Sequence, residues 1–170
     1  MRDATERDAE ACAAIYAPYV SATAITFENV PPTAGEMARR IATARASHAW
    51  VVFEEAGRVI GYAYGAPFAK RDAYRWSCEV SVYIEQGRRR SGAGRALYEV
   101  LFERLADRGY RTVAAGMTLP NEASVGLHQA LGFEHVGTFR DIGFKHETWH
   151  DVAWMQRPLD GGTEPPQEPR

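Results

Sequence analysis

The fold is decided where the chain reads Arg88-Arg89-Arg90-Ser91-Gly92-Ala93-Gly94-Arg95-Ala96-Leu97. Before this stretch, apolar and polar side chains alternate through residues 75–85, a period of two that predicts a half-buried strand. After it, Leu97, Leu101 and Leu105 recur at every fourth position and predict one apolar face of a helix, which Gly109 is placed to end. The stretch therefore joins a strand directly to a helix.

Glycines and arginines give this junction its chemistry. Glycine allows a positive φ and a close approach of the backbone to a ligand, and the first N–H groups of a helix attract an anion. Arginine adds charge and paired donors for phosphate oxygens. We interpret the junction as a cradle for a diphosphate, and a plain loop with solvated arginines is the alternative that this pattern alone leaves open. The residues after Gly94 match neither a Walker A loop nor a full dinucleotide fingerprint.

The composition describes a single domain. A chain of 170 residues, 45% of them apolar, is long enough to bury a core. The net charge of −2 argues against general nucleic-acid binding, which needs a basic surface. Cys12 and Cys78 form neither a disulfide framework nor a zinc ligand set. The N-terminus carries no apolar targeting segment and no run of residues approaches a membrane span, so we expect a cytoplasmic protein without a membrane partner.

Capping signals predict three more helices. Thr5 and the acids after it predict the start of the first helix, and Pro18 is expected to disturb its end. Thr33 opens a capping box for the second helix. Asn121 is expected to cap the last helix, which Gly132 stops.

Strand patterns alternate with these helices. They cover residues 50–53, 59–64, 75–85, 112–117, 133–140 and 149–157. The order of the elements predicts an α/β fold with a mixed sheet and helices on both of its faces. We expect one domain over residues 1–158. Residues 159–170 are polar and rich in proline and glycine, which predicts a disordered tail.

Arg89-x-x-Gly92-x-Gly94 resembles the acyl-CoA diphosphate motif of the GNAT acetyltransferase superfamily, and residues 143–152 are similar to a signature of its phosphinothricin acetyltransferases. The resemblance covers residues 1–158 and implies the GNAT fold, a mixed, mostly antiparallel central sheet flanked by helices on both faces. It also implies acetyl-CoA as co-substrate, no metal and a homodimer. The implied acetyl-CoA contacts are Val80, Val82, Tyr83, Arg88, Arg89, Arg90, Ser91, Gly92, Ala93, Gly94, Arg95, Asn121, Ser124 and His128.

Glu79 lies in an otherwise apolar strand, on the face that it shares with Ser77 and Ser81. Periodicity alone favours an exposed or ion-paired carboxylate, with Arg75 as a partner. The resemblance implies a general base instead, because a glutamate at this place before the cradle has that proposed role in the phosphinothricin group. A carboxylate can accept the proton that an ammonium group must lose before it attacks a thioester. Cys78 alternates to the opposite face and is a poor candidate for a nucleophile.

His146-Glu147-Thr148-Trp149-His150 spells the H-E-x-x-H motif of zinc proteases. That motif binds zinc only on a helix, where both histidines share one face. The residue types here favour a strand, in which the histidines would lie about 13 Å apart, so we expect no zinc site. The resemblance implies that His146 is a second catalytic residue, as proton acceptor or relay. A structural histidine that donates to a backbone carbonyl is the alternative.

The cofactor side shows one departure from the superfamily. Many members of the superfamily carry at this position a tyrosine that protonates the departing thiolate. This chain has His128 there instead, and the phosphinothricin group also has a histidine. A thiolate is a good leaving group, so this acid can be dispensable. Asn121 and Ser124 match positions that touch the cofactor, and capping of a helix is a sufficient role for them as well.

The resemblance implies an amino-acid pocket lined by Phe27, Arg71, Tyr74 and Tyr83. Arg71 would hold a carboxylate or phosphinate through its forked guanidinium. Ala69 stands where related enzymes carry a cation, so methionine sulfoximine or sulfone is as suitable a substrate as phosphinothricin. We expect acetylation of the α-amine of such an analogue. A GNAT enzyme for a protein N-terminus, antibiotic or polyamine, and a non-catalytic acyl-CoA-binding module, are the alternatives.

Overall fold

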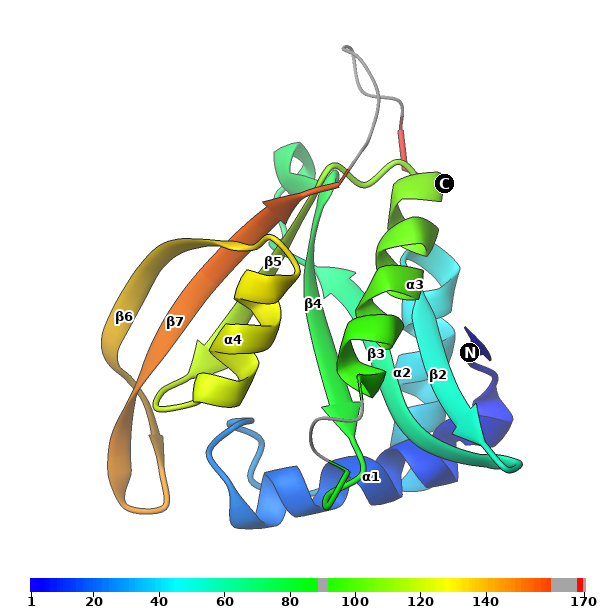
Figure 1. Ribbon diagram of the computed structural model, residues 1–170, viewed down its shortest axis with the longest axis horizontal. Helices are drawn as coiled ribbons and strands as arrows, with labels where there is room; N and C mark the ends of the chain where they lie inside the picture. Colours follow the sequence, from blue (N-terminus) through cyan, green and yellow to red (C-terminus); the bar gives the residue numbers. More distant parts are fainter. Residues whose placement is uncertain (89–91, 160–167, 170) are drawn as a thin grey trace.

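A single mixed sheet forms the centre of the molecule in the computed structural model, which describes residues 1–88, 92–159 and 168–169 (Figure 1). The strands lie in the order β1-β2-β3-β4-β5-β7-β6. Neighbouring strands are antiparallel except β4 and β5, which are parallel. The bounds are β1 (Arg2–Asp3), β2 (Trp50–Glu55), β3 (Arg58–Pro67), β4 (Ser77–Ile84), β5 (Thr112–Thr118), β6 (Glu134–Lys145) and β7 (Thr148–Pro158).

Helices cover both faces of the sheet, as the sequence predicts (Figure 1). One core lies between the sheet and α3 (Ala93–Asp107), with Leu97, Leu101 and Leu105 fully buried. The other lies under α1 (Ala9–Ala22) and α2 (Ala34–Ser47) and includes Ile41 and Tyr62. α4 (Glu122–Ala130) lies beside α3 on the first face, and two 3-10 turns, η1 (Glu6–Asp8) and η2 (Asp72–Tyr74), complete the elements.

The predicted caps are confirmed. The Thr33 side chain accepts a hydrogen bond from the Glu36 N–H, and Asn121 accepts one from the Ser124 N–H at 3.2 Å. Thr5 precedes η1 and donates its N–H to the Asp8 carboxylate at 2.7 Å. These contacts satisfy N–H groups that have no intrahelical acceptor.

α1 continues through Pro18 to Ala22, so this proline does not end the helix. Proline removes one helical hydrogen bond, but packing of a buried face can hold the remaining turns. Tyr16 and Val20, on either side of Pro18, are both buried in the core under α1.

The strands also extend beyond their predicted ends. β6 reaches Lys145 instead of residue 140, and the short β1 was not predicted. Leu159 is buried, and its N–H donates to the main-chain carbonyl oxygen of Arg111, so the core includes one residue of the predicted tail. Residues 160–167 and 170 of that tail lie outside the described part. Among the described helices, none has the length and apolar character needed to cross a membrane.

Candidate active site

The sheet opens between β4 and β5. The two strands are paired only where residues 77–79 face residues 112–114. Beyond this point β4 continues to Ile84 and β5 to Thr118, and the strands diverge (Figure 1). No described strand pairs with residues 80–84 of β4 on the side of β5. Backbone N–H and C=O groups at this opening, including those of Val80 and Val82, can therefore serve an extended ligand.

Glu79 lies where the two strands part. It occupies the last paired position of β4, opposite Ala114 on β5 and Ala66 on β3. Its neighbours Cys78 and Val80 face the core under α3, so the Glu79 side chain points to the α1 and α2 face. The small alanine side chains leave space beside its carboxylate. Desolvation by burial raises the pKa of Glu79, which makes it a stronger base than an exposed glutamate.

Two alternatives for this strand are not found. Arg75 does not pair with Glu79, because its guanidinium lies over the Trp76 ring and binds the carboxylate of Glu168 at 2.7 Å. Cys78 is fully buried on the α3 face, and burial raises the pKa of its thiol to about 12. Such a thiol is not ionised near neutral pH and is inert as a nucleophile.

The turn before α3 contains a glycine with positive φ. Gly92 precedes the helix with φ +78°, and among the described residues beyond its chain neighbours no atom lies within 4 Å of the place where a Cβ would stand. The first turn contains no acidic residue that could neutralise the positive end of the helix dipole. Gly94 has a second purpose, since a Cβ there would lie 3.2 Å from Leu127 of α4. Arg89, Arg90 and Ser91 lie outside the described residues.

The described arginine side chains around the cradle have protein partners. Arg88 donates to Glu55 at 2.5 Å and to Glu85 at 2.9 Å. Arg95 donates to the carbonyl oxygen of Ala130, at the end of α4, at 3.1 Å. The structure therefore gives the guanidinium groups of Arg88 and Arg95 contacts within the protein.

His128 is enclosed between α3 and α4. It is 2% exposed, its Nδ1–H donates to the carbonyl oxygen of Ser124 at 2.8 Å, and its Nε2 lies 3.2 Å from the Tyr98 hydroxyl, which donates to it. Burial lowers the pKa of His128, so the ring stays neutral. With both nitrogens engaged, the imidazole is a packing element of α4, and this arrangement does not offer a proton to a leaving group.

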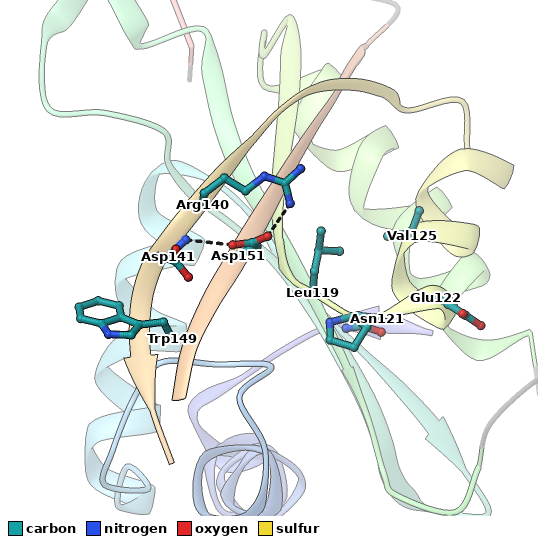
Figure 2. A pocket seen from close by; sticks show the side chains of 9 residues that line it. Leu119, Asn121, Glu122, Val125, Arg140, Asp141, Trp149 and Asp151 are labelled. Carbon is teal, nitrogen blue, oxygen red and sulfur yellow. Dashed lines mark hydrogen bonds and ion pairs between the residues drawn. The ribbon is translucent and has the colours of Figure 1, made fainter. Parts of the chain in front are cut away.

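Asn121 lies in the turn before α4 and lines a pocket of about 620 Å³ (Figure 2). The opposite wall of this pocket comes from the middle of β6 and β7, where Arg140 and Asp151 form an ion pair. Trp149 closes one end and is 59% exposed. The pocket thus joins a predicted cofactor residue to the outer edge of the sheet.

The predicted substrate residues lie at different depths. Phe27 and Tyr74 are partly exposed, on the α1–α2 loop (residues 23–33) and in η2, and Arg71 is an exposed residue just before η2. Tyr74 contacts Phe68, whose ring meets Trp154. These aromatic rings lie on the face of Glu79, because Trp154 pairs with Gly116, two positions beyond the partner of Glu79.

Tyr83 is on the same face but lies in the core, 9% exposed. Its ring centroid is 4.7 Å from that of Tyr16 and 5.3 Å from that of Tyr19. The structure therefore shows it as part of the support beneath the site. Sequence reasoning missed Tyr64, which pairs with Ser81 and lines a second pocket of about 430 Å³ that reaches Ala66, the cross-strand neighbour of Glu79. In the sequence, an aromatic residue of a strand that lines a pocket cannot be distinguished from one that packs in the core.

His146 and Glu147 form the turn between β6 and β7, with φ +51° and +58°. The predicted strand is therefore wrong at these two positions, since a two-residue hairpin turn requires positive φ. His146 is exposed at the tip, and His150 donates from Nε2 to the carbonyl oxygen of Lys145 at 3.0 Å. A zinc site would need a helix here, and no group of three potential metal ligands occurs among the described residues.

Comparison with known proteins gives the class of enzyme that the resemblance implies, a GNAT acetyltransferase. The sequence model of the GNAT acetyltransferase domain matches residues 1–154. The chain is 36% identical over 160 residues to phosphinothricin N-acetyltransferase of Streptomyces viridochromogenes, covering 94% of this chain and 87% of the relative. It is 35% identical over 162 residues to the L-methionine sulfoximine/L-methionine sulfone acetyltransferase of Pseudomonas aeruginosa, covering 94% of each chain.

A solved structure agrees with these relatives. The phosphinothricin acetyltransferase of Sinorhizobium meliloti, in complex with AcCoA, superimposes with a TM-score of 0.92 at 40% identity, covering 98% of this chain and 92% of that one. The chain belongs to the GNAT acetyltransferase family. It is an N-acetyltransferase that uses acetyl-CoA as co-substrate.

Proposed function

We propose that this enzyme acetylates the α-amino group of a small amino-acid analogue, namely phosphinothricin, methionine sulfoximine or methionine sulfone. The observation that carries the proposal is the position of Glu79, half-buried where β4 and β5 part, on the sheet face opposite α3. A thioester that reaches the opening from the cradle side then meets an amine that arrives from the side of Glu79. The names of relatives that cover nearly the whole chain supply the substrate class.

The residues at the opening divide the work of the transfer. Glu79 accepts a proton from the substrate ammonium, and the freed nitrogen lone pair forms a C–N bond with the thioester carbonyl carbon. A main-chain N–H of β4 beside that carbon stabilises the oxyanion. The C–S bond then breaks, coenzyme A leaves as the thiolate without help from the buried His128, and the second proton of the newly bonded nitrogen passes to solvent. His146 acts as a further proton acceptor or relay at the hairpin tip, and much of the rate comes from holding amine and thioester together.

The substrate groups are assigned by charge and position. The main-chain N–H groups that follow Gly92 bind the diphosphate of acetyl-CoA, together with Arg89 and Arg90. Arg71 holds the carboxylate or phosphinate of the acceptor, and Phe27 and Tyr74 supply its apolar walls. Asn121 and Ser124 lie at the start of α4, where they contact the cofactor in addition to their capping bond.

A free-thiol assay tests the proposal directly. Purified protein with acetyl-CoA should release thiol in a saturable way with at least one of the three analogues. Release with peptide N-termini, antibiotics or polyamines, and with none of the analogues, would assign the enzyme to another amine. Thermal stabilisation by acetyl-CoA without any turnover would instead favour a binding module.

We also propose that the enzyme is a homodimer that associates through the β6–β7 hairpin. β6 is an edge strand of the sheet, and its outer side has no described partner. Val136, Phe139, Ile142, Phe144 and Trp149 of this hairpin are each 55–60% exposed. A long apolar edge strand invites pairing with a second copy unless it is covered. A two-fold axis would let the same surface serve both protomers.

Sedimentation velocity checks this prediction. The wild-type protein should sediment as a dimer at micromolar concentration, and the double variant Phe139→Asp/Trp149→Asp should sediment as a monomer with unchanged circular dichroism. Val30→Asp is the matched control, since Val30 is 76% exposed but lies on the α1–α2 loop. A monomeric wild type, or a dimer that survives the double substitution, would refute the hairpin interface.

A further inference from the structure

Lys145 is a buried cation that the proposed mechanism does not use. It is the last residue of β6 and is 5% exposed. Its ammonium donates to the carbonyl oxygens of Val20 and Thr26, each at 2.7 Å. Val20 belongs to the last turn of α1, where carbonyl groups lack an intrahelical partner and the helix dipole favours a positive charge. The buried ammonium of this hairpin residue therefore binds main-chain carbonyl groups of a segment that is distant in the sequence.

Lys145 contacts the end of α1 through Val20 and the α1–α2 loop through Thr26. Thr26 is held a second time through its hydroxyl, which lies 2.6 Å from the hydroxyl of Tyr16. Phe27 packs directly on Gly143 of β6, where a Cβ would lie 2.2 Å from the ring. The Phe27 ring centroid is also 6.2 Å from that of His150, which itself binds the Lys145 carbonyl. Loop and hairpin therefore meet through one charged contact and one close aromatic contact.

The choice of lysine suits this place. Lysine occurs in the chain only at positions 70 and 145, and arginine supplies all the other basic side chains apart from histidine. An ammonium is compact and directs three donors, so it fits between two carbonyl oxygens where a planar guanidinium would need more room. Desolvation lowers the pKa of Lys145 and the negative charge of Glu28 opposes this effect. A buried charge persists only where hydrogen bonds compensate its lost hydration. The two carbonyl oxygens provide this compensation for the Lys145 ammonium.

We propose that Lys145 is a positioning residue for the acceptor amino acid. It holds the α1–α2 loop against the β6–β7 hairpin, so that Phe27 of the loop and His146 of the hairpin keep one fixed separation. The inference rests on the proposed function, which places both residues at the acceptor. It concerns the amino acid alone, since the hydrogen bonds of the Lys145 ammonium found among the described residues go to Val20 and Thr26 and not to the cradle at α3 or the opening of the sheet.

The first test is kinetic. Lys145→Met removes the charge but keeps the length of the side chain, and should raise the KM of the amino acid about tenfold, the equivalent of one lost hydrogen-bonded anchor. The KM of acetyl-CoA should stay within about twofold. Tyr110→Phe is the matched control, because Tyr110 donates to the Ser47 carbonyl oxygen at the end of α2, and its loss should affect stability without changing either KM. Equal increases in both KM values, or an unchanged amino-acid KM, would overturn the proposal.

A second variant leaves the charge in place. Gly143→Ala adds only a methyl group against the Phe27 ring, at a backbone conformation that alanine tolerates. It should raise the amino-acid KM in the same direction as Lys145→Met, even if the methionine variant folds poorly. An unchanged amino-acid KM in this variant would show that the separation of loop and hairpin does not matter to the acceptor.

Amide hydrogen exchange provides a readout that needs no substrate. In Lys145→Met, exchange should accelerate together in residues 20–28 and 143–150, and remain unchanged in α3. If the wild type acetylates none of the amino acids, the proposed function fails, while the exchange result still decides whether Lys145 joins the two segments. Acceleration spread over the whole chain, or confined to one of the two segments, would contradict the inference.

Discussion

Glu79→Gln is expected to lower kcat by about 10²–10⁴-fold, the usual contribution of a positioned general base. Glutamine has the shape of glutamate but accepts no proton at neutral pH, so the ammonium of the substrate keeps the proton that blocks its attack. The affinity for acetyl-CoA should be unchanged, because the cradle at Gly92 lies at the far end of β4. Steady-state kinetics and calorimetric titration of acetyl-CoA measure the two effects separately.

Glu134→Gln is the control, since Glu134 is an exposed strand carboxylate at the start of β6. It should retain wild-type turnover. A Glu79→Gln variant as active as the wild type would exclude the role of this carboxylate in proton transfer.

The pH profile gives a second measure of the same group. Burial raises the pKa of Glu79 above its ordinary value of 4.5, and only the ionised form is a base. The value of kcat/KM should therefore fall as the pH drops through the raised pKa, and this acidic limb should be missing in the glutamine variant. The effect on folding has the opposite direction. The folded state holds this proton more tightly than the unfolded chain. Ionisation of Glu79 therefore lowers the free energy of unfolding as the pH rises from the ordinary pKa of the unfolded chain through the raised pKa of the folded state.

Gly92→Val is expected to weaken acetyl-CoA binding by about tenfold or more. A β-branched residue at φ +78° is strained by about 1–3 kcal/mol, and relief of that strain must tilt the turn that aims the first N–H groups of α3. A side chain would also occupy the space through which, in the proposed function, the diphosphate approaches the backbone. Isothermal titration with acetyl-CoA, and its KM, measure the loss.

Gly132→Val separates strain from binding. Gly132 has φ +81°, and no atom of the described residues beyond its chain neighbours lies within 4 Å of the place where its Cβ would stand, but it follows α4 instead of preceding α3. Both valine variants should lose similar stability in thermal unfolding, and only Gly92→Val should lose acetyl-CoA. Equal affinities in the two variants would show that the turn at Gly92 does not bind the cofactor.

Most of the fold could be predicted because its signals are local. Alternation identified β4, leucines at helical spacing identified α3, and capping residues marked α2 and α4 within a residue or two. Local signals were insufficient where distant packing decides. Pro18 lies inside α1 because buried neighbours hold the helix, and β6 extends to Lys145 because β7 pairs with it that far.

Some features of the candidate site could likewise be predicted from local sequence signals, and others could not. The position of Gly92 before a helix and the face of Glu79 follow from spacing alone. The partners of long side chains do not, since the acids that bind Arg88 come from β2 and from the end of β4, and periodicity gives no sign of either contact. His146 likewise owes its place to the hairpin turn, which the residue types of the motif do not reveal.

The sequence by itself determined a strand–glycine turn–helix unit with a carboxylate on the strand face opposite the helix, because side-chain alternation and glycine conformation act within a few residues. The class of enzyme came from the resemblance of this unit and of residues 143–152 to the GNAT acetyltransferases. Only the tertiary structure decided where β4 and β5 part and what surrounds each charge. It placed Glu79 between two alanines, enclosed His128 under α3 and sent Lys145 to the end of α1. These features depend on which distant segments meet, and hydration, burial and hydrogen bonding act only after they have met.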